Sequence, residues 1–186
     1  MGYGWEGRLV KLVPLDVDQH LEHAAKWMND PEITQYLLVG DFPMTRLAER
    51  EWFETHSKVG GTDVQFGIET VQGKHIGFSG IHRISWKDGT AATGTLIGEK
   101  GEWGKGYGTD SASVRSRYAF DVLGLRMLYS SVLAGNERSL KMLLKAGYRE
   151  CGRMPLRHWK RGSYVDEILL YLDRDSWTES HAASAS

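Results

Sequence analysis

The chain carries five glycines between Gly98 and Gly108. They follow an expected strand and precede an expected helix. The N-terminus of a helix exposes backbone N–H groups without intrahelical partners and carries a partial positive charge. Glycine lets an anion come close to such donors, because it has no Cβ. The segment therefore predicts a phosphate-binding turn.

The spacing of these glycines excludes two common phosphate motifs. A P-loop requires Ser or Thr after Gly-Lys, but Gly106 follows Lys105, and Glu99 stands at the position of the first glycine. The dinucleotide fingerprint requires a third glycine where this chain has Thr109 or Ser111, depending on the starting glycine. The phosphate ligand is thus expected to be bound in another way.

A second candidate element begins at Asn136. Asn is a favourable N-cap, and Gly147 is a favourable residue after the helix end, so the sequence predicts a helix over Glu137–Ala146. Cys151 lies in an expected strand, and we expect a buried structural thiol there rather than a nucleophile.

The elements around these residues follow from hydrophobic periodicity and turn residues. Expected strands cover Arg8–Val13, Val64–Ile68, Ile76–Ser85, Thr93–Gly98, Met127–Leu133, Tyr148–Met154 and Tyr164–Leu172. The other expected helices cover Asp16–Met28, Glu32–Leu38, Met44–Lys58 and Asp110–Leu123. An antiparallel meander followed by a β-α-β unit predicts one α/β or α+β domain.

Composition excludes several function classes. Lys and Arg number 23 and Asp and Glu 24, so the net charge of −1 offers no broad basic field for nucleic acid or membranes. One cysteine excludes an internal disulfide and a multi-cysteine metal cluster, and we expect no metal and a cytoplasmic location. Residues 1–7 are expected to form an N-terminal extension without the hydrophobic stretch of a signal peptide, and residues 176–186 a mobile tail.

Three segments together resemble one enzyme family. Trp103–Asp110 resembles the acetyl-CoA pyrophosphate loop of the GNAT acyltransferases, Arg/Gln-x-x-Gly-x-Gly/Ala, with Trp103 at the Arg/Gln position. The form Trp-Gly-Lys-Gly-Tyr-Gly-Thr is similar to the RimJ/RimL-like branch. Asn136–Tyr148 resembles the second cofactor motif, and Arg161–Glu167 the C-terminal hairpin of that branch. The resemblance covers roughly residues 8 to 177, in the family's order.

The resemblance implies a GNAT fold over residues 8–175, with pantetheine between two splayed parallel strands. A backbone N–H of the first strand would bind the thioester oxygen, and Asn136 would add a hydrogen bond to its N-cap role. The implied cofactor-binding residues are Leu96, Ile97, Gly98, Trp103, Gly104, Lys105, Gly106, Tyr107, Gly108, Thr109 and Asn136. Arg138, Lys141 and Lys145 could meet the 3′-phosphate or could be ordinary surface residues.

The resemblance also suggests catalytic residues. The tyrosine acid of many GNAT enzymes is replaced by Leu143, and Ser139 stands where the RimL-like branch places a serine for that role. His158 stands at the position of that branch's base, and neutral histidine suits the task. Ala92 occupies the place of the acidic strand residue of many relatives. The rival bases are Glu69, His82 and Glu99.

The implied function is transfer of an acetyl group from acetyl-CoA to a primary amine. The acceptor would be a protein N-terminus, such as that of a ribosomal protein, or a small amine. The absence of a tyrosine at Leu143 leaves open a catalytically weak CoA-binding sensor or partner module, and a homodimer is also left open. Four aromatic residues of the early helices could pack in the core or line the acceptor site: Trp27, Tyr36, Trp52 and Phe53.

Overall fold

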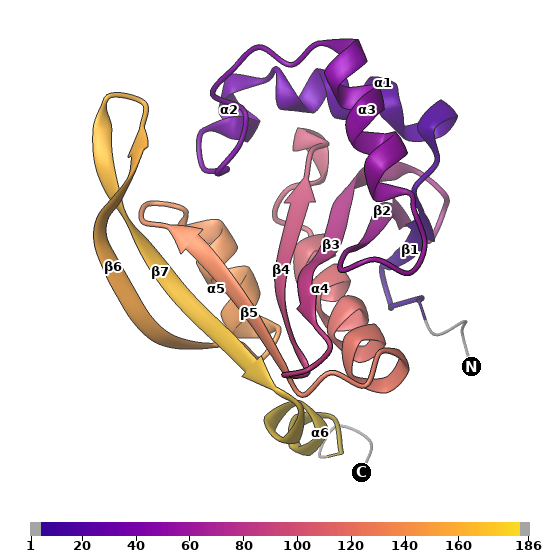
Figure 1. The fold of residues 1–186 in the computed structure, drawn as a ribbon, viewed down its shortest axis with the longest axis vertical. Coiled ribbons are helices and arrows are strands. Elements are labelled where there is room, and N and C mark those ends of the chain that lie inside the picture. The colour runs from indigo at the N-terminus through magenta and orange to yellow at the C-terminus, as the bar shows by residue number, and fades with distance from the viewer. Residues whose placement is uncertain (1–4, 183–186) are drawn as a thin grey trace.

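The computed structural model describes residues 5–182 and contains one seven-stranded sheet with helices on both faces (Figure 1). The strand order is β1-β2-β3-β4-β5-β7-β6. The strands are β1 Val10–Pro14, β2 Val64–Thr70, β3 His75–Ser85, β4 Thr90–Ile97, β5 Met127–Leu133, β6 Arg149–Lys160 and β7 Ser163–Asp173. Neighbouring strands are antiparallel except for β4 and β5, which are parallel. The expected mixed α+β architecture is confirmed.

The helices pack on the two faces of this sheet. They are α1 Val17–Met28, α2 Pro31–Thr34, α3 Arg46–His56, α4 Tyr107–Arg117, α5 Glu137–Lys145 and α6 Arg174–Ala182, with a 3₁₀ turn η1 at Lys100–Glu102 and a π-turn η2 at Tyr118–Val122. The main core joins α4 and α5 to the sheet through residues such as Ala112, Leu143, Leu128 and Ile168. On the other face, α1 and α3 pack on Phe78 of β3.

The structure shortens the expected second helix to one turn. Asp30 caps it by accepting the N–H of Glu32, and Pro31 occupies its first turn. The Thr34 hydroxyl then donates to the Asp30 carbonyl at 3.0 Å, and such side-chain bonds compete with helix continuation. Residues after Thr34 therefore form a loop rather than the expected helix to Leu38.

Two further expectations are corrected. Part of the expected tail is helical, because α6 begins at Arg174 and Trp177 is buried against Phe120, with ring centroids 5.5 Å apart. Residues 183–186 of that tail and residues 1–4 of the expected extension lie outside the described residues. Cys151 is exposed rather than buried, because it lies on β6 at the edge of the sheet.

Asp110 joins the N-terminal strand to α4. Its carboxylate accepts the backbone N–H groups of Arg8, Leu9 and Val10 at 3.3, 2.7 and 3.0 Å. Charge-assisted bonds of this kind are stronger than neutral ones. They fix the first turn of α4 against β1.

Three histidines meet where α1 crosses β3. The Nδ1 atoms of His23 and His75 are 2.8 Å apart, and His75 Nε2 lies 2.9 Å from the Gly77 carbonyl. A carbonyl only accepts, so His75 is protonated on Nε2 and its Nδ1 accepts from His23. The ring of His20 is 4.3 Å from that of His75 between centroids, and His20 is buried. Burial, the neighbouring His20 and His23 lower the pKa of His75 to about 3, despite the opposing bond to Gly77.

This cluster predicts acid sensitivity of the fold. The unfolded chain binds a proton at this residue near pH 6.5, and the folded chain only near pH 3. Stability therefore falls as pH decreases below about 6.5. We expect His75→Gln to reduce the loss of unfolding free energy between pH 7 and pH 5 by about 1–2 kcal/mol, allowing for screening at the partly exposed ring. Urea unfolding at both pH values measures this, with His56→Gln on α3 as control. An unchanged loss in His75→Gln would contradict it.

Candidate functional site

The two central parallel strands pair over only three residues. The pairs run from Thr90–Met127 to Ala92–Tyr129. After them, β4 continues to Ile97 and β5 to Leu133 without pairing with each other. Side chains bridge the point of divergence: the Thr93 hydroxyl donates to the Tyr129 carbonyl at 2.9 Å, and the Ser130 hydroxyl donates to the Thr93 carbonyl at 3.2 Å. Beyond them, β4 and β5 no longer pair with each other, and the space between their unpaired ends is called the cleft below.

The backbone of β4 turns alternate residues toward this cleft. The Gly98 N–H donates to the Ile76 carbonyl on β3 at 2.9 Å, and the Thr93 carbonyl faces β5. Because strand residues alternate, the N–H groups of Thr95 and Ile97 also face β5. Three residues at the end of this strand are expected to bind pantetheine. The backbone N–H groups of Leu96 and Gly98 point toward β3, and that of Ile97 points toward the cleft.

The glycine-rich loop lies at the open end of the cleft and leads into α4. Gly104 and Gly106 adopt φ values of +79° and +90°, and Gly106 is the N-cap of the helix. Asp110 makes the first intrahelical bond, to the Gly106 carbonyl. The N–H groups of Tyr107, Gly108 and Thr109 therefore precede the first intrahelical bond and are available to a ligand. The helix starts three residues earlier than expected, since left-handed Gly106 permits the turn.

The glycines of this segment have different roles. A Cβ at Gly104 would meet nothing within 4 Å, so the backbone there is open. A Cβ at Gly108 would lie 2.8 Å from Met142 Sδ, so this glycine permits α4 to pack closely against α5. A Cβ at Gly98 would overlap the buried indole of Trp27.

Trp103 connects the loop to both strand and helix. Its indole N–H donates to the Ile97 carbonyl at 2.7 Å, and the Arg138 guanidinium lies 3.7 Å from its ring centroid. The ring thus holds Arg138 by a cation–π contact. Lys105, expected to neutralise pyrophosphate, lies 2.8 Å from Glu102, which also pairs with Lys74 at 2.9 Å.

Asn136 and Ser139 open α5. The Asn136 side-chain oxygen accepts the Ser139 N–H at 3.1 Å, which confirms the N-cap. The amide N–H₂ group of Asn136 is then the side-chain donor that can meet a ligand. Ser139 is half-buried, whereas Leu143 is 2% exposed and packs in the main core. The position of the family's tyrosine is therefore entirely apolar.

His158 lies beside a buried carboxylate that the sequence analysis did not single out. Its Nε2 is 3.3 Å from Glu167 Oε2, and Arg157 Nε is 3.1 Å from the same oxygen. Burial opposes ionisation of Glu167, but a hydrogen bond from Ser131, the contact with His158 and the charge of Arg157 hold its pKa below the usual value. Glu167 pairs with Leu133, the last residue of β5.

The three alternative candidates for the general base, His82, Glu69 and Glu99, lie at different distances from the cleft. His82 pairs with Ala92 and lies over Gly94, beside the divergence point. Its Nδ1 is 2.8 Å from Gln65 Nε2, a donor, which places the ring proton on Nε2. Glu69 lies on β2, two strands from β4, and the Glu99 N–H donates to the Ile76 carbonyl at 3.2 Å, beyond the end of β4.

A family model of the acetyltransferase (GNAT) domain matches residues 9–149. The chain belongs to the GNAT acetyltransferase family. It is 24% identical over 150 residues to the uncharacterised N-acetyltransferase p20 of Bacillus licheniformis, covering 79% of this chain and 83% of that protein. It is 30% identical over 104 residues to the uncharacterised N-acetyltransferase YoaA of Bacillus subtilis, covering 55% of this chain and 58% of that one.

Solved structures share the GNAT fold. Spermidine N-acetyltransferase from Vibrio cholerae, crystallised with CoA and spermine, matches with a TM-score of 0.83 and 20% identity, covering 91% of this chain and 98% of that one. The microcin C7 self-immunity acetyltransferase MccE, crystallised with acetyl-CoA and AMP, matches with a TM-score of 0.77 and 15% identity, covering 89% and 93%.

GNAT enzymes use acetyl-CoA, and the cleft fits that molecule. The gap between β4 and β5 leaves the backbone of Thr95 and Ile97 facing an extended ligand. The open backbone at Gly104 and the first-turn N–H groups of α4 fit a pyrophosphate. Within residues 5–182, no cluster of three or more acidic, His or Cys residues could hold a metal, and no helix is long and apolar enough to cross a membrane.

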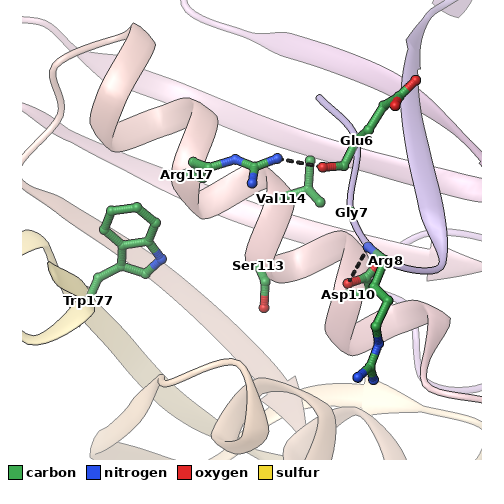
Figure 2. Close-up of a pocket in the computed structure, with 8 residues that line it drawn as sticks. All are labelled: Glu6, Gly7, Arg8, Asp110, Ser113, Val114, Arg117 and Trp177. Atoms are coloured by element: carbon green, nitrogen blue, oxygen red, sulfur yellow. Dashed lines mark hydrogen bonds between the residues drawn. The ribbon is translucent and has the colours of Figure 1, made fainter. Parts of the chain in front are cut away.

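A pocket outside this cleft is a structural junction. Figure 2 shows it between α4, the N-terminal segment and Trp177 of α6. Two hydrogen bonds cross it: Asp110 accepts from the Arg8 N–H, and Arg117 donates to the Glu6 carbonyl at 2.6 Å. Figure 2 therefore shows residues 6–8 held against α4, with Trp177 of α6 at another wall of the pocket.

The loop geometry predicts the effect of Gly106→Val. A β-branched residue at φ +90° is strained, and its side chain blocks the approach to the N–H groups of α4. We expect acetyl-CoA affinity to fall at least about 100-fold, or about 2.7 kcal/mol, in a protein that still unfolds cooperatively. Calorimetric titration measures it.

Gly101→Val is the matched control in the same loop, because a Cβ at Gly101 makes only an ordinary contact, 3.7 Å from Glu99, without a positive φ. Unchanged affinity in folded Gly106→Val would overturn the phosphate-binding role of the loop.

The two roles of Asn136 can be separated. Asn136→Ala should lower stability by about 1 kcal/mol through the lost cap and cofactor binding by about 0.5–1.5 kcal/mol through a lost ligand hydrogen bond. Asn136→Asp keeps the cap oxygen and removes the amide N–H₂, so stability should hold while acetyl-CoA affinity falls. Thermal melting and titration of both variants measure this. If affinity holds in both, Asn136 is a cap only.

Proposed function

We propose that this chain transfers the acetyl group of acetyl-CoA to a primary amine by direct attack. The observation that carries the proposal is the cleft: β4 and β5 diverge after Ala92–Tyr129, and the Gly106 loop and α4 lie at its open end. Acetyl-CoA supplies the activated acetyl thioester. The residues of the chain hold it and move the protons.

In the proposed mechanism, the Ile97 N–H binds the thioester oxygen, on which negative charge develops during transfer. The Trp103 indole holds the adjoining Ile97 carbonyl, and Trp27 packs on Gly98, so this strand end is fixed before the reaction. The Ser139 hydroxyl, half-buried at the start of α5, donates a proton to the leaving sulfur.

His158 accepts the proton of the attacking amine. Its Nε2 lies 3.3 Å from Glu167 Oε2 without a hydrogen bond between the two atoms, and the negative charge of the carboxylate favours the tautomer with the proton on Nε2, which leaves the Nδ1 lone pair free. His82 lies nearer the divergence point, but the Gln65 donor on its Nδ1 leaves it no ring nitrogen with a free lone pair. The orientation of the two rings therefore favours His158.

The acceptor class is the open part of this proposal. A spermidine acetyltransferase and an acetyltransferase crystallised with AMP share the fold at 20% and 15% identity, and we carry over only an amine acceptor. Membership of the RimJ/RimL-like branch is also proposed, on Trp103–Thr109 and Arg161–Glu167. The cytoplasmic location stays a prediction. So does the homodimer, for which the exposed edge strand β6 offers a surface.

An acceptor screen tests the function. Released CoA thiol is measured with spermidine, with peptides bearing free N-termini and with aminoacyl nucleotides, each as the only amine. Amine-dependent release supports the transferase. Leu143, buried in the core, favours the alternative of a CoA-binding sensor module, and tight acetyl-CoA binding without turnover on any amine would establish that alternative.

Loss of a positioned acid or base typically costs about 10²–10⁴-fold in rate. His158→Ala and Ser139→Ala should each lower kcat by that amount with acetyl-CoA affinity nearly intact. Raising the pH should partly restore the kcat of His158→Ala, because more of the amine is then unprotonated. It should not restore the kcat of Ser139→Ala. His82→Ala is the comparison variant. Full activity of His158→Ala with loss in His82→Ala would move the base to His82.

A further inference from the structure

Arg115 carries a positive charge that the mechanism above does not use. It lies in the middle of α4, is 0% exposed and faces the underside of β4. Among residues 5–182, no carboxylate forms an ion pair with it. A buried charge without a counterion is strongly unfavourable. A buried, unpaired guanidinium at this position therefore suggests a functional role for its charge.

All contacts of the guanidinium lead to one segment of the sheet. One terminal nitrogen, Nη1, shares its two N–H groups among three acceptors, the Gly94 carbonyl at 2.6 Å, the Thr95 hydroxyl at 2.5 Å and the Ser79 hydroxyl at 3.1 Å. Nε and Nη2 are buried and have no hydrogen-bond partner. The charge is thus only partly compensated by neutral dipoles. It lies against the α4 face of β4, at the residues where β4 no longer pairs with β5.

The Gly94 carbonyl belongs to the same peptide unit as the Thr95 N–H. The carbonyl accepts from Arg115, and the N–H faces the cleft. A cation at the carbonyl end polarises the peptide and makes its N–H a stronger donor. The charge itself also acts through the thickness of one strand, in an interior where charges are poorly screened.

Other polar groups around Arg115 do not neutralise it. His82 lies over Gly94 on the opposite face of the sheet. Burial lowers the pKa of His82, Asp63 opposes the shift and the charge of Arg115 adds to it, so this ring is held neutral. Ser111, one turn earlier on α4, and Ser116 are buried hydroxyls without a partner. The electrostatic potential of Arg115 therefore reaches the cleft without being cancelled by these groups.

We propose that Arg115 stabilises the negative charge that acyl transfer develops in the cleft, and that it does so on the leaving sulfur of CoA. This inference rests on the proposed function and deepens it. In the transfer, the amine nitrogen bonds to the acetyl carbon, the C–S bond breaks and its electron pair leaves on sulfur, while the amine proton goes to His158. Leu143 is buried and apolar, so the proton for that sulfur comes from Ser139 as proposed above. A fixed cation on the far side of β4 stabilises the thiolate before this proton arrives, because it lowers the pKa of the thiol.

The thiol pKa of bound CoA tests the inference without turnover. Thiolate absorbance of CoA, saturated with protein, is followed against pH. For the unaltered chain we expect a thiol pKa at least about one unit below the ~8.5 of a free thiol. Arg115→Gln, which keeps a side-chain donor and removes the charge, should return it to about 8.5 or higher. Arg115→Lys, which keeps the charge, should hold it low.

Arg126→Met is the matched control, because Arg126 is exposed and bonds the Asp88 carbonyl, outside this cluster. Arg115→Met serves if Arg115→Gln does not fold. A thiol pKa at or above about 8.5 in the unaltered chain overturns the inference without any variant, and so does an equally low value in Arg115→Gln. Either result leaves the proposed function standing. Failure of CoA to bind would overturn the proposed function and this inference together.

Discussion

The site depends on the early end of the β4–β5 ladder. Once the two strands separate after Ala92 and Tyr129, the backbone groups that would have bonded across them need other partners. Thr93 and Ser130 supply two at the divergence point, and Trp103 supplies one at Ile97. Under the proposed function, the backbone groups that remain, such as the Thr95 and Ile97 N–H groups, bind an extended ligand that completes the sheet. β3 on one side and β7 on the other keep β4 and β5 apart, since each pairs along most of its neighbour.

Helix α4 brings three functions to this opening. Its first turn presents N–H groups and the positive end of the helix dipole at the cleft mouth. Asp110 in that turn fixes β1 through three backbone bonds, and Arg115 lies one turn further along, under β4. Small residues beside Arg115 allow the helix to approach the sheet closely; Ser111, Ala112 and Ser116 are all buried. A bulkier helix face would move both the first-turn N–H groups of α4 and the charge of Arg115 away from β4.

Local signals predicted much of this arrangement from the sequence. The strand Met127–Leu133 has the expected bounds, and Asn136 caps α5 as its side chain predicts. The glycine-rich turn was identified because its residues are adjacent in the chain. The one-turn length of α2 depends instead on a Thr34 side-chain bond that competes with the helix, which periodicity does not register.

Residues whose roles depend on contacts between distant segments could not be predicted from the local sequence. Glu167 pairs with Met154 in the strand register, and a β-bulge between Met154 and His158 brings the ring of His158, which pairs with Val165, to within 3.3 Å of the Glu167 carboxylate. Arg115 in a helical segment suggests a solvated face by ordinary patterning, and only the packing of α4 on β4 shows it to be buried. Trp103 departs from the family's Arg/Gln pattern, and its purpose is visible only in the contacts to Ile97 and Arg138.

The arrangement also separates the two charges that the proposed reaction creates. Arg115 lies on the face of β4 that α4 covers, whereas Glu167 and His158 lie on the side of β7 turned away from the core residues Ile168 and Leu170. Negative charge on sulfur is therefore stabilised from behind the strand, and positive charge on His158 is stabilised by Glu167 on the opposite face. Arg115 and Glu167 lie on opposite faces of the sheet, and β5 lies between β4, against which Arg115 packs, and β7, which carries Glu167, so their fixed charges do not pair with each other. If the two groups met on one face, they would form an ordinary ion pair, and neither charge would remain available to the reaction.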